Sequence, residues 1–223
     1  MSDEHRESDH STQVFRKAEP MTQQDAVQRR VAGIVLAGGR SRRMGQTKAS
    51  LDWDGEPMLA RIVRIVAERC DAVFVVAPAD SAAYQELFGT GGPEATWVTD
   101  EEPGSGPLGG LAAGLAAAAE TGARWAFVSA TDTPLISAEL IEELLRGATA
   151  STQAVIANDT ERDHPMAGLY RTDTASTIAE LTAAGERRML GALDALNTRR
   201  VAVSNPEWLT NVNAPEDLHR LHV

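Results

Sequence analysis

A basic, glycine-rich stretch at residues 33–48, GIVLAGGRSRRMGQTK, has the residue types of a phosphate-binding loop. Gly38 and Gly39 follow a short apolar run, and glycines at such a place let backbone N–H groups approach an anion closely. Cations follow at Arg40, Arg42, Arg43 and Lys48. We expect Arg43 and Lys48 to contact phosphate and the other two arginines to face water. The stretch therefore predicts a cradle for a polyphosphate.

The spacing of this stretch does not fit the common phosphate-binding motifs. A P-loop requires glycine, four residues, and then Gly-Lys-Ser/Thr, but Gly45 is followed by Gln46 and Thr47 before Lys48. A dinucleotide fingerprint requires G-x-G-x-x-G, and the consecutive pair Gly38-Gly39 breaks that pattern. We therefore expect a long loop that wraps around its ligand.

Two carboxylates follow other apolar runs. Asp132 comes after WAFVSA at 125–130, and a carboxylate is a hard oxygen ligand suited to Mg²⁺ that also contacts substrate phosphates. Its alternative role, capping the next helix, suits Ser137 better. Asp100 follows ATWV at 95–98. It is expected either to accept a hydrogen bond from a base or a ribose hydroxyl, or to cap a turn.

These residues sit within a regular alternation of strands and helices. Short apolar runs predict strands at 31–37, 72–77, 95–98, 125–130, 153–157, 165–170 and 199–203. Helical spacing predicts helices at 57–68, 81–88, 111–120, 172–184 and 186–196, one capped by Ser137, and one starting at Pro215. Such alternation predicts an α/β fold with a mostly parallel sheet. Ligands of such sheets bind at the carboxyl ends of the strands, which places Gly38, Asp100 and Asp132 on one rim.

Composition limits the possible functions. The chain has 223 residues and a net charge of -11, which argues against general nucleic-acid binding but not against binding one nucleotide. No apolar run is long enough to span a membrane, and a single cysteine excludes an internal disulfide. Residues 1–30 are polar and predict a disordered tail, with the folded domain at 31–223. We therefore expect a cytoplasmic protein without nucleic-acid or membrane partners.

The loop LAGGRSRRMGQTK at 36–48 resembles the signature of the nucleotidyltransferase superfamily. Further segments resemble the molybdenum cofactor guanylyltransferase (MobA) family, and the similarity covers almost everything from Val31 onward. These segments are GPLGGL (106–111), TDTPLI (131–136), ERDHP (161–165), AGERR (184–188) and NVNAPEDL (211–218). The resemblance implies a single-domain, three-layer α/β/α Rossmann-like nucleotidyltransferase fold.

The resemblance also implies an activity, the transfer of GMP from GTP to Mo-molybdopterin with release of pyrophosphate and dependence on Mg²⁺. It implies catalytic roles for Lys48, Arg43 and Asp132, with Asp132 as the magnesium ligand. The GTP-binding residues implied in this way are Leu36, Ala37, Gly38, Gly39, Lys48, Asp100 and Asp132. Asn213 matches a position near the metal in related transferases, and whether it is a second ligand stays open.

The acceptor side is less defined by the sequence. We expect ERDHP and AGERR to face molybdopterin through Arg162, His164, Arg187 or Arg188, with plain surface charge as the alternative for each. Transient contact with proteins that deliver molybdopterin or receive the cofactor is also expected.

Two departures from the family pattern bear on the nucleotide. Thr47 stands where the family often has an aspartate, and Pro78 follows the second strand without the asparagine that some members use. Neither departure removes a charge that the chemistry needs. The alternatives to this activity are a cytidylyltransferase for the same cofactor, a sugar-phosphate nucleotidyltransferase, or a catalytically silent nucleotide-binding protein.

Overall fold

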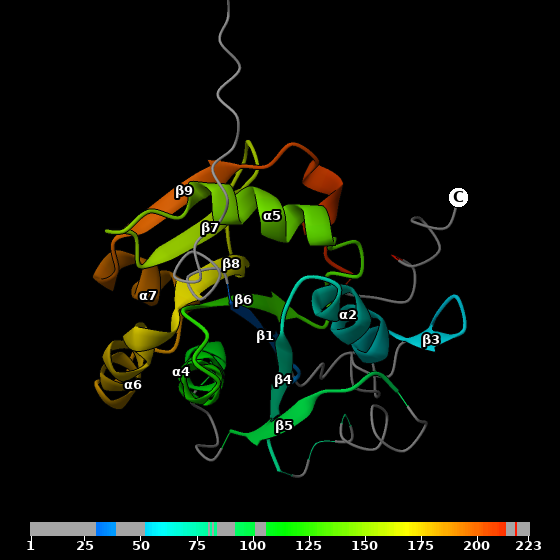
Figure 1. The fold of residues 1–223 in the computed structure, drawn as a ribbon, viewed down its shortest axis with the longest axis horizontal. Helices are drawn as coiled ribbons and strands as arrows, with labels where there is room; N and C mark the ends of the chain where they lie inside the picture. Colours follow the sequence, from blue (N-terminus) through cyan, green and yellow to red (C-terminus); the bar gives the residue numbers. More distant parts are fainter. Residues whose placement is uncertain are drawn as a thin grey trace, which may run out of the picture.

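The computed structural model describes residues 30–38, 52–79, 81, 83, 92–100, 106–212 and 217. Seven strands of this described chain form one sheet in the order β5-β4-β1-β6-β8-β7-β9 (Figure 1). The strands are β1 (Val31–Leu36), β4 (Ala72–Ala77), β5 (Thr96–Thr99), β6 (Trp125–Ala130), β7 (Ala154–Asn158), β8 (Asp163–Arg171) and β9 (Thr198–Ala202). The expected α/β class and the mostly parallel sheet are confirmed.

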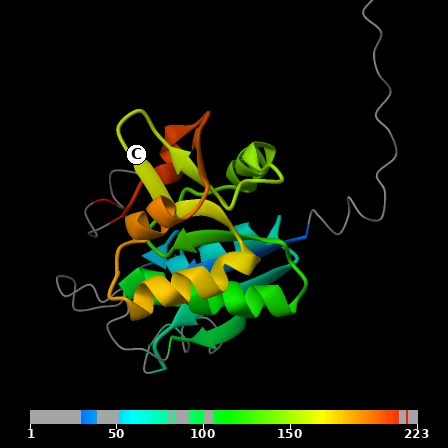
Figure 2. The same cartoon turned by 90° about the vertical axis from the view of Figure 1, so that its left-hand side faces the viewer.

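Helices cover both faces of this sheet. They are α2 (Met58–Ala67), α4 (Gly106–Glu120), α5 (Ala138–Gly147), α6 (Ala175–Ala183) and α7 (Met189–Ala195), with short 3₁₀ turns η2 (Thr172–Thr174) and η3 (Pro206–Leu209). Figure 1 shows α2 and α5 on one side of the sheet and α4, α6 and α7 on the other, and Figure 2 shows α4 and α6 lying along that second face. The arrangement is the expected three-layer α/β/α fold.

The core is divided by the sheet, because successive side chains of a strand point to opposite faces. On β1, Val31 and Val35 pack with α2 and α5, whereas Ile34 and Leu36 pack with α4, α6 and α7. All six residues of β1 are buried. A strand buried on both faces is a continuous apolar run, which is why its end at Leu36 was predicted from the sequence to within one residue.

One strand of the sheet runs against the others. β8 pairs antiparallel with both β6 and β7, while β7 and β9 are parallel. The connection between β7 and β8 is too short for a crossover, so only an antiparallel pair can form there. As a result the 158–163 connection lies at the rim where β6 ends.

Several element boundaries differ from the expected ones. α4 begins at Gly106 rather than at residue 111. The stretch GPLGG is helical. Gly106 enters the helix with a left-handed φ of 70°, and Pro107 fits the first turn, where its missing N–H costs nothing. The stretch 172–184 divides into η2 and α6, and the expected helix at 186–196 is shorter, at Met189–Ala195.

A two-residue turn stands before α2. Asp54 and Gly55 both have positive φ, 54° and 83°, and join the two short antiparallel strands β2 (Asp52–Trp53) and β3 (Glu56–Pro57). Asp-Gly in this conformation is the preferred tight turn of a hairpin. The sequence WDGEP at 53–57 is typical of a turn, but nothing in it marks the two short strands.

No helix in the described ranges is both long and apolar enough to cross a membrane. The predictions for residues 1–29, for most of the 81–88 helix and for most of the helix after Pro215 lie outside the described residues.

Candidate functional site

Four parallel strands end side by side at one rim of the sheet. Leu36 of β1 is in register with Val76 of β4 and Ala130 of β6, and Ala77 of β4 is in register with Thr99 of β5. Beyond the last pairs, the backbone N–H of Ala37 donates to the carbonyl of Val76 at 2.8 Å. The segments that follow these strands therefore emerge together.

The end of β1 offers backbone rather than side chains. Leu36 and Ala37 are each 8% exposed. Gly38 is exposed, but a Cβ at this position would lie 3.2 Å from Cδ of Pro78. Any contribution of these three residues to nucleotide binding would come from main-chain atoms, as expected of a glycine-containing strand end.

Asp100 follows β5, at one end of the rim. Its backbone N–H donates to the carbonyl of Ala77 at 3.0 Å, which fixes it beside the end of β4. Its partly buried side chain reaches α4, where Oδ2 lies 3.9 Å from the place a Cβ of Gly110 would occupy. Gly110 thus leaves room for this carboxylate against the helix.

Asp132 follows β6, three strands away from Asp100 in the order β5-β4-β1-β6. At roughly 4.8 Å between neighbouring strands, the two strand ends are about 14 Å apart. That separation is too large for the two carboxylates to share one ion, and it leaves the end of β1 between them. The rim is therefore long enough for an extended ligand, with one end near Asp100 and the other near Asp132.

The backbone around Asp132 is held from two sides. Its carbonyl accepts a 2.7 Å hydrogen bond from the N–H of Val212, which belongs to the NVN segment. On the other side, Oγ1 of Thr133 donates to the carbonyl of Ala130 at 3.1 Å and lies 3.2 Å from the buried Oγ of Ser129. The Asp132 side chain is partly exposed. The segment is therefore fixed while its carboxylate is accessible.

The donor set at this end of the rim suits a magnesium ion that is shared with a substrate. No group of three or more His, Cys, Asp or Glu side chains in the described part of the chain is arranged to hold a metal by itself. Mg²⁺ is commonly held by one or two carboxylates together with substrate phosphates. Asp132 fits that chemistry, because among the described residues it stands without two further His, Cys, Asp or Glu side chains placed to complete a metal site.

Four predicted residues, Gly39, Arg43, Lys48 and Asn213, lie outside the described residues. Their roles stay predictions. Of the others, Leu36, Ala37, Gly38, Asp100 and Asp132 all lie on the one rim that the strand ends form.

A second group of polar residues lies in the connection between β7 and β8. One carboxylate, Asp159, organises it: Oδ1 accepts from the N–H groups of Glu161 and Arg162 at 2.8 Å, and Oδ2 lies 2.6 Å from Nε2 of His164. The hydrogen bond with His164, followed by those from the two N–H groups, lowers the pKa of Asp159 to about 2. This connection is a preformed turn.

For His164, the alternative of plain surface charge is wrong. His164 is 9% exposed and belongs to β8, next to an irregularity in the pairing between β7 and β8. Its partner Asp159 lies five residues earlier in the sequence, and no common motif marks that spacing.

A third group lies in the turn between α6 and α7. Glu186 accepts hydrogen bonds from the N–H groups of Arg187 and Arg188, both at 2.9 Å, and from the guanidinium of Arg188. The side-chain bond from Arg188 is the largest cause that lowers the pKa of Glu186 to about 2. The carbonyl of Arg187 lies 3.0 Å from the Cβ position of Gly106, where α4 begins. This turn therefore lies against the start of α4, next to the Asp100 end of the rim.

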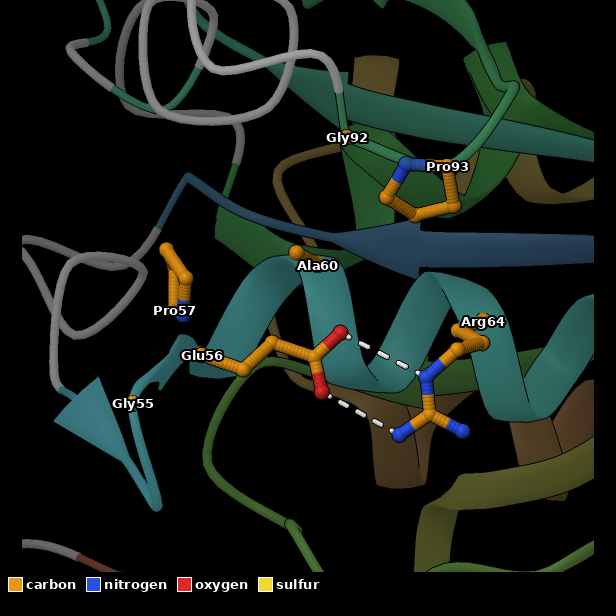
Figure 3. A pocket seen from close by; sticks show the side chains of 7 residues that line it. All are labelled: Gly55, Glu56, Pro57, Ala60, Arg64, Gly92 and Pro93. Atoms are coloured by element: carbon orange, nitrogen blue, oxygen red, sulfur yellow. Dashed lines mark hydrogen bonds and ion pairs between the residues drawn. The ribbon is translucent and has the colours of Figure 1, made fainter.

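An open depression of about 470 Å³ lies away from these groups (Figure 3). It is lined by Gly55, Glu56, Pro57, Ala60, Arg64, Gly92 and Pro93, so it includes none of the predicted site residues. The ion pair between Glu56 and Arg64, at 3.1 Å, crosses it.

The chain was compared with protein families and with individual known proteins. Residues 33–198 match the family model described as MobA-like NTP transferase domain. A protein of Mycolicibacterium paratuberculosis named probable molybdenum cofactor guanylyltransferase is 43% identical over 195 residues, which cover 86% of this chain and 94% of that protein. A protein of Mycobacterium marinum with the same name is 42% identical and covers 84% and 91%.

Solved structures show the same fold. Molybdopterin-guanine dinucleotide biosynthesis protein A from Archaeoglobus fulgidus has a TM-score of 0.70 at 24% identity, covering 85% of this chain and 95% of that one. A nucleotidyl transferase from Methanothermobacter thermautotroptrophicus has a TM-score of 0.69 at 20% identity, covering 86% and 95%.

Proposed function

Because the chain belongs to the MobA-like NTP transferase family, we propose that it transfers GMP from GTP to Mo-molybdopterin. The products are the molybdopterin guanine dinucleotide cofactor and pyrophosphate. The chain is a nucleotidyltransferase, and relatives more than 40% identical that carry the guanylyltransferase name support its place in molybdenum cofactor biosynthesis. The observation that carries the proposal is the rim where β5, β4, β1 and β6 end together, with Asp100 and Asp132 on either side of Gly38.

The reaction joins two anions. A phosphate oxygen of molybdopterin forms a bond to the α-phosphorus of GTP, and the bond from that phosphorus to the oxygen bridging to the β-phosphate breaks. The electron pair leaves with pyrophosphate. Because the acceptor phosphate is already an anionic nucleophile, no strong general base is required. Catalysis then consists of positioning and of neutralising charge.

We assign the binding of the phosphates, of Mg²⁺ and of the nucleoside to different residues along the rim. Main-chain groups of Gly38 and Gly39, with the side chains of Arg43 and Lys48, would bind the β- and γ-phosphates and hold them as pyrophosphate leaves. Asp132 would hold Mg²⁺, which when bound lowers the negative charge that develops on the phosphates. Asp100, at the other end, would accept a hydrogen bond from the ribose or the base.

The acceptor would bind across the two preformed turns. The Asp159 turn at the end of β7 presents the exposed Arg162, and the Glu186 turn presents Arg188, whose side chain is 77% exposed. A planar guanidinium matches the two oxygens of a phosphate, so Arg162 suits the phosphate of molybdopterin. In Arg188 the Nε and Nη2 groups donate to Glu186, so this arginine would contact the phosphate through its remaining N–H groups. We propose that GTP and molybdopterin meet between the rim and these turns, in a cytoplasmic protein, with transient contact to proteins that bring or receive the cofactor.

One assay tests the function. Pyrophosphate release is measured with GTP, CTP, ATP and UTP in turn, with and without Mo-molybdopterin, and with Mg²⁺ or with EDTA. We expect release only from GTP, only with the acceptor and only with Mg²⁺. Preference for CTP would instead indicate a cytidylyltransferase. If sugar 1-phosphates replaced molybdopterin, the chain would be a sugar-phosphate transferase, and no release under any condition would indicate a silent binding protein.

A further inference from the structure

A small apolar cluster lies apart from the two large halves of the core. Trp53, Met58 and Val212 are buried in it, and Leu135 packs against them. These residues come from four places: the hairpin that follows residues 39–51, the start of α2, the segment after Asp132, and the NVN segment. Three of those places adjoin predicted site residues. The cluster therefore joins the parts of the chain from which the proposed nucleotide site is built.

Arg61 of α2 makes two contacts at this cluster. Its Nε donates to the carbonyl of Pro134 at 3.0 Å, and its guanidinium carbon lies 5.4 Å from the centre of the Trp53 ring. The indole is 4% exposed and Pro134 is buried, so both contacts face the interior. A cation over an aromatic face and a charged donor to a carbonyl are both stronger when partly shielded from water.

The two partners of Arg61 lie next to different halves of the site. Pro134 is two residues after Asp132, in the segment whose other side is held by the hydrogen bond from Val212. Trp53 is in the hairpin that continues the chain from Lys48. Since Pro134 has no N–H, its carbonyl is the only main-chain hydrogen-bonding group it can use to hold this segment.

We propose that Arg61 is a positioning residue that fixes the 131–136 segment, and with it Asp132, relative to the hairpin that ends the glycine-rich loop. The inference deepens the proposed function and rests on it. Arg61 does not touch the substrate in this role. It sets the distance between two elements that must grip one triphosphate, one through cations and the other through a carboxylate.

Arg64 provides a matched control on the same helix. It is exposed, its guanidinium pairs with Glu56 at 3.1 Å, and it lies one turn from Arg61. Its ion pairs are with Glu56 and Glu68, both outside the 131–136 segment. Replacing either arginine removes one positive charge from α2, so a difference between the two variants isolates the contacts with Pro134 and Trp53.

The test measures equilibrium binding of a fluorescent GTP analogue to the full chain, once with Mg²⁺ and once with EDTA. The wild type is compared with Arg61→Gln, Arg61→Lys and Arg64→Gln. In Arg61→Gln we expect the affinity gained by adding Mg²⁺ to fall about tenfold, since a charged hydrogen bond and its alignment are lost. The affinity in EDTA is expected to stay within about twofold, and Arg64→Gln to match the wild type, because neither depends on where Asp132 sits.

Arg61→Lys keeps a cation near Trp53 but cannot reproduce the planar guanidinium, so we expect an intermediate loss. If Arg61→Gln does not fold, the binding measurements are made on Arg61→Lys instead. The inference is overturned if the Arg61 variants lose affinity equally with Mg²⁺ and with EDTA, if they lower only the melting temperature, or if Arg64→Gln has the same effect. A wild type that binds GTP with no gain from Mg²⁺ contradicts the proposed function itself, and so is distinguished from failure at Arg61.

Discussion

The rim at the ends of β5, β4, β1 and β6 and the two turns at 158–163 and 184–188 are positioned in different ways. On the rim, Asp100 and Asp132 stand where buried strands end, and backbone hydrogen bonds hold them. In the turns, one carboxylate gathers several donors of its own loop, as Asp159 and Glu186 do. The comparison shows that the rim depends on the whole sheet, whereas each turn depends on a single side chain.

The largest expected effect is at the rim. We expect Asp132→Asn to lower kcat by about 10²–10³-fold, because a charged group that acts on the transition state is lost while the segment keeps its shape. Pyrophosphate release with saturating GTP measures this. Asp100→Asn is the matched variant, and we expect it to act mainly on KM for GTP. Near-normal kcat in Asp132→Asn would contradict the metal assignment.

A change in the packing between β1 and α2 tests whether the rim depends on the sheet. A Cβ at Gly33 of β1 would lie 2.2 Å from Cγ1 of Val66 in α2, so Gly33→Ala forces the strand and helix apart. We expect a loss of about 1–3 kcal/mol in the free energy of unfolding, measured by urea denaturation. Gly110→Ala is the control, since its Cβ meets only ordinary contacts at 3.4 Å or more. Equal stability of the two variants would mean that β1 tolerates displacement.

The turn at 158–163 is expected to respond to one side chain. His164→Ala removes the 2.6 Å partner of Asp159. We expect KM for molybdopterin to rise about three- to tenfold, the range for one hydrogen bond, with KM for GTP unchanged. Steady-state kinetics with each substrate varied in turn measures both constants. A rise in KM for GTP instead would show that the turn and the rim are not separate.

The smallest effect is in the acid stability. The pKa values of Asp159 and Glu186 are each lowered to about 2, by hydrogen bonds from His164 and Arg188 first. Because the folded values lie below the unfolded ones, near 4, the stabilisation is complete above about pH 5 and is lost as the pH falls toward 2. Melting temperatures from pH 7 to pH 3 are compared for the wild type and for the double variant Asp159→Asn, Glu186→Gln. We expect the melting temperature of the wild type to fall more between pH 7 and pH 3 than that of the double variant. If the two melting temperatures fell in parallel, these carboxylates would have no role in acid stability.

The same difference explains what could be predicted from the sequence. Strand ends are marked by buried apolar runs that stop at polar residues, so Gly38, Asp100 and Asp132 could be placed on one rim without coordinates. The start of α4 could not be predicted in this way. Gly106 and Pro107 have the composition of a loop, although they fit the first turn of a helix.

The turns at 158–163 and 184–188 are not marked in the sequence by the end of a buried apolar run. Asp159 accepts hydrogen bonds from N–H groups two and three residues later and pairs with His164, five residues later. Glu186 accepts from the N–H groups of the next two residues and from the side chain of Arg188. Many surface turns have the same composition, so neither the burial of His164 nor its partner followed from the pattern. The contact between Arg61 and Pro134 spans 73 residues and was equally hidden.

The reversed direction of β8 decides at which end of the sheet the 158–163 turn lies. A parallel strand in its place would require a crossover, and the chain after β7 would have to return to the opposite end of the strands before that strand began. The antiparallel strand returns the chain at once, so the arginine-bearing turn before it emerges beside the end of β6. The direction of this one strand thus places the turn that carries Arg162 at the same rim as Asp132, where the two proposed substrates would meet.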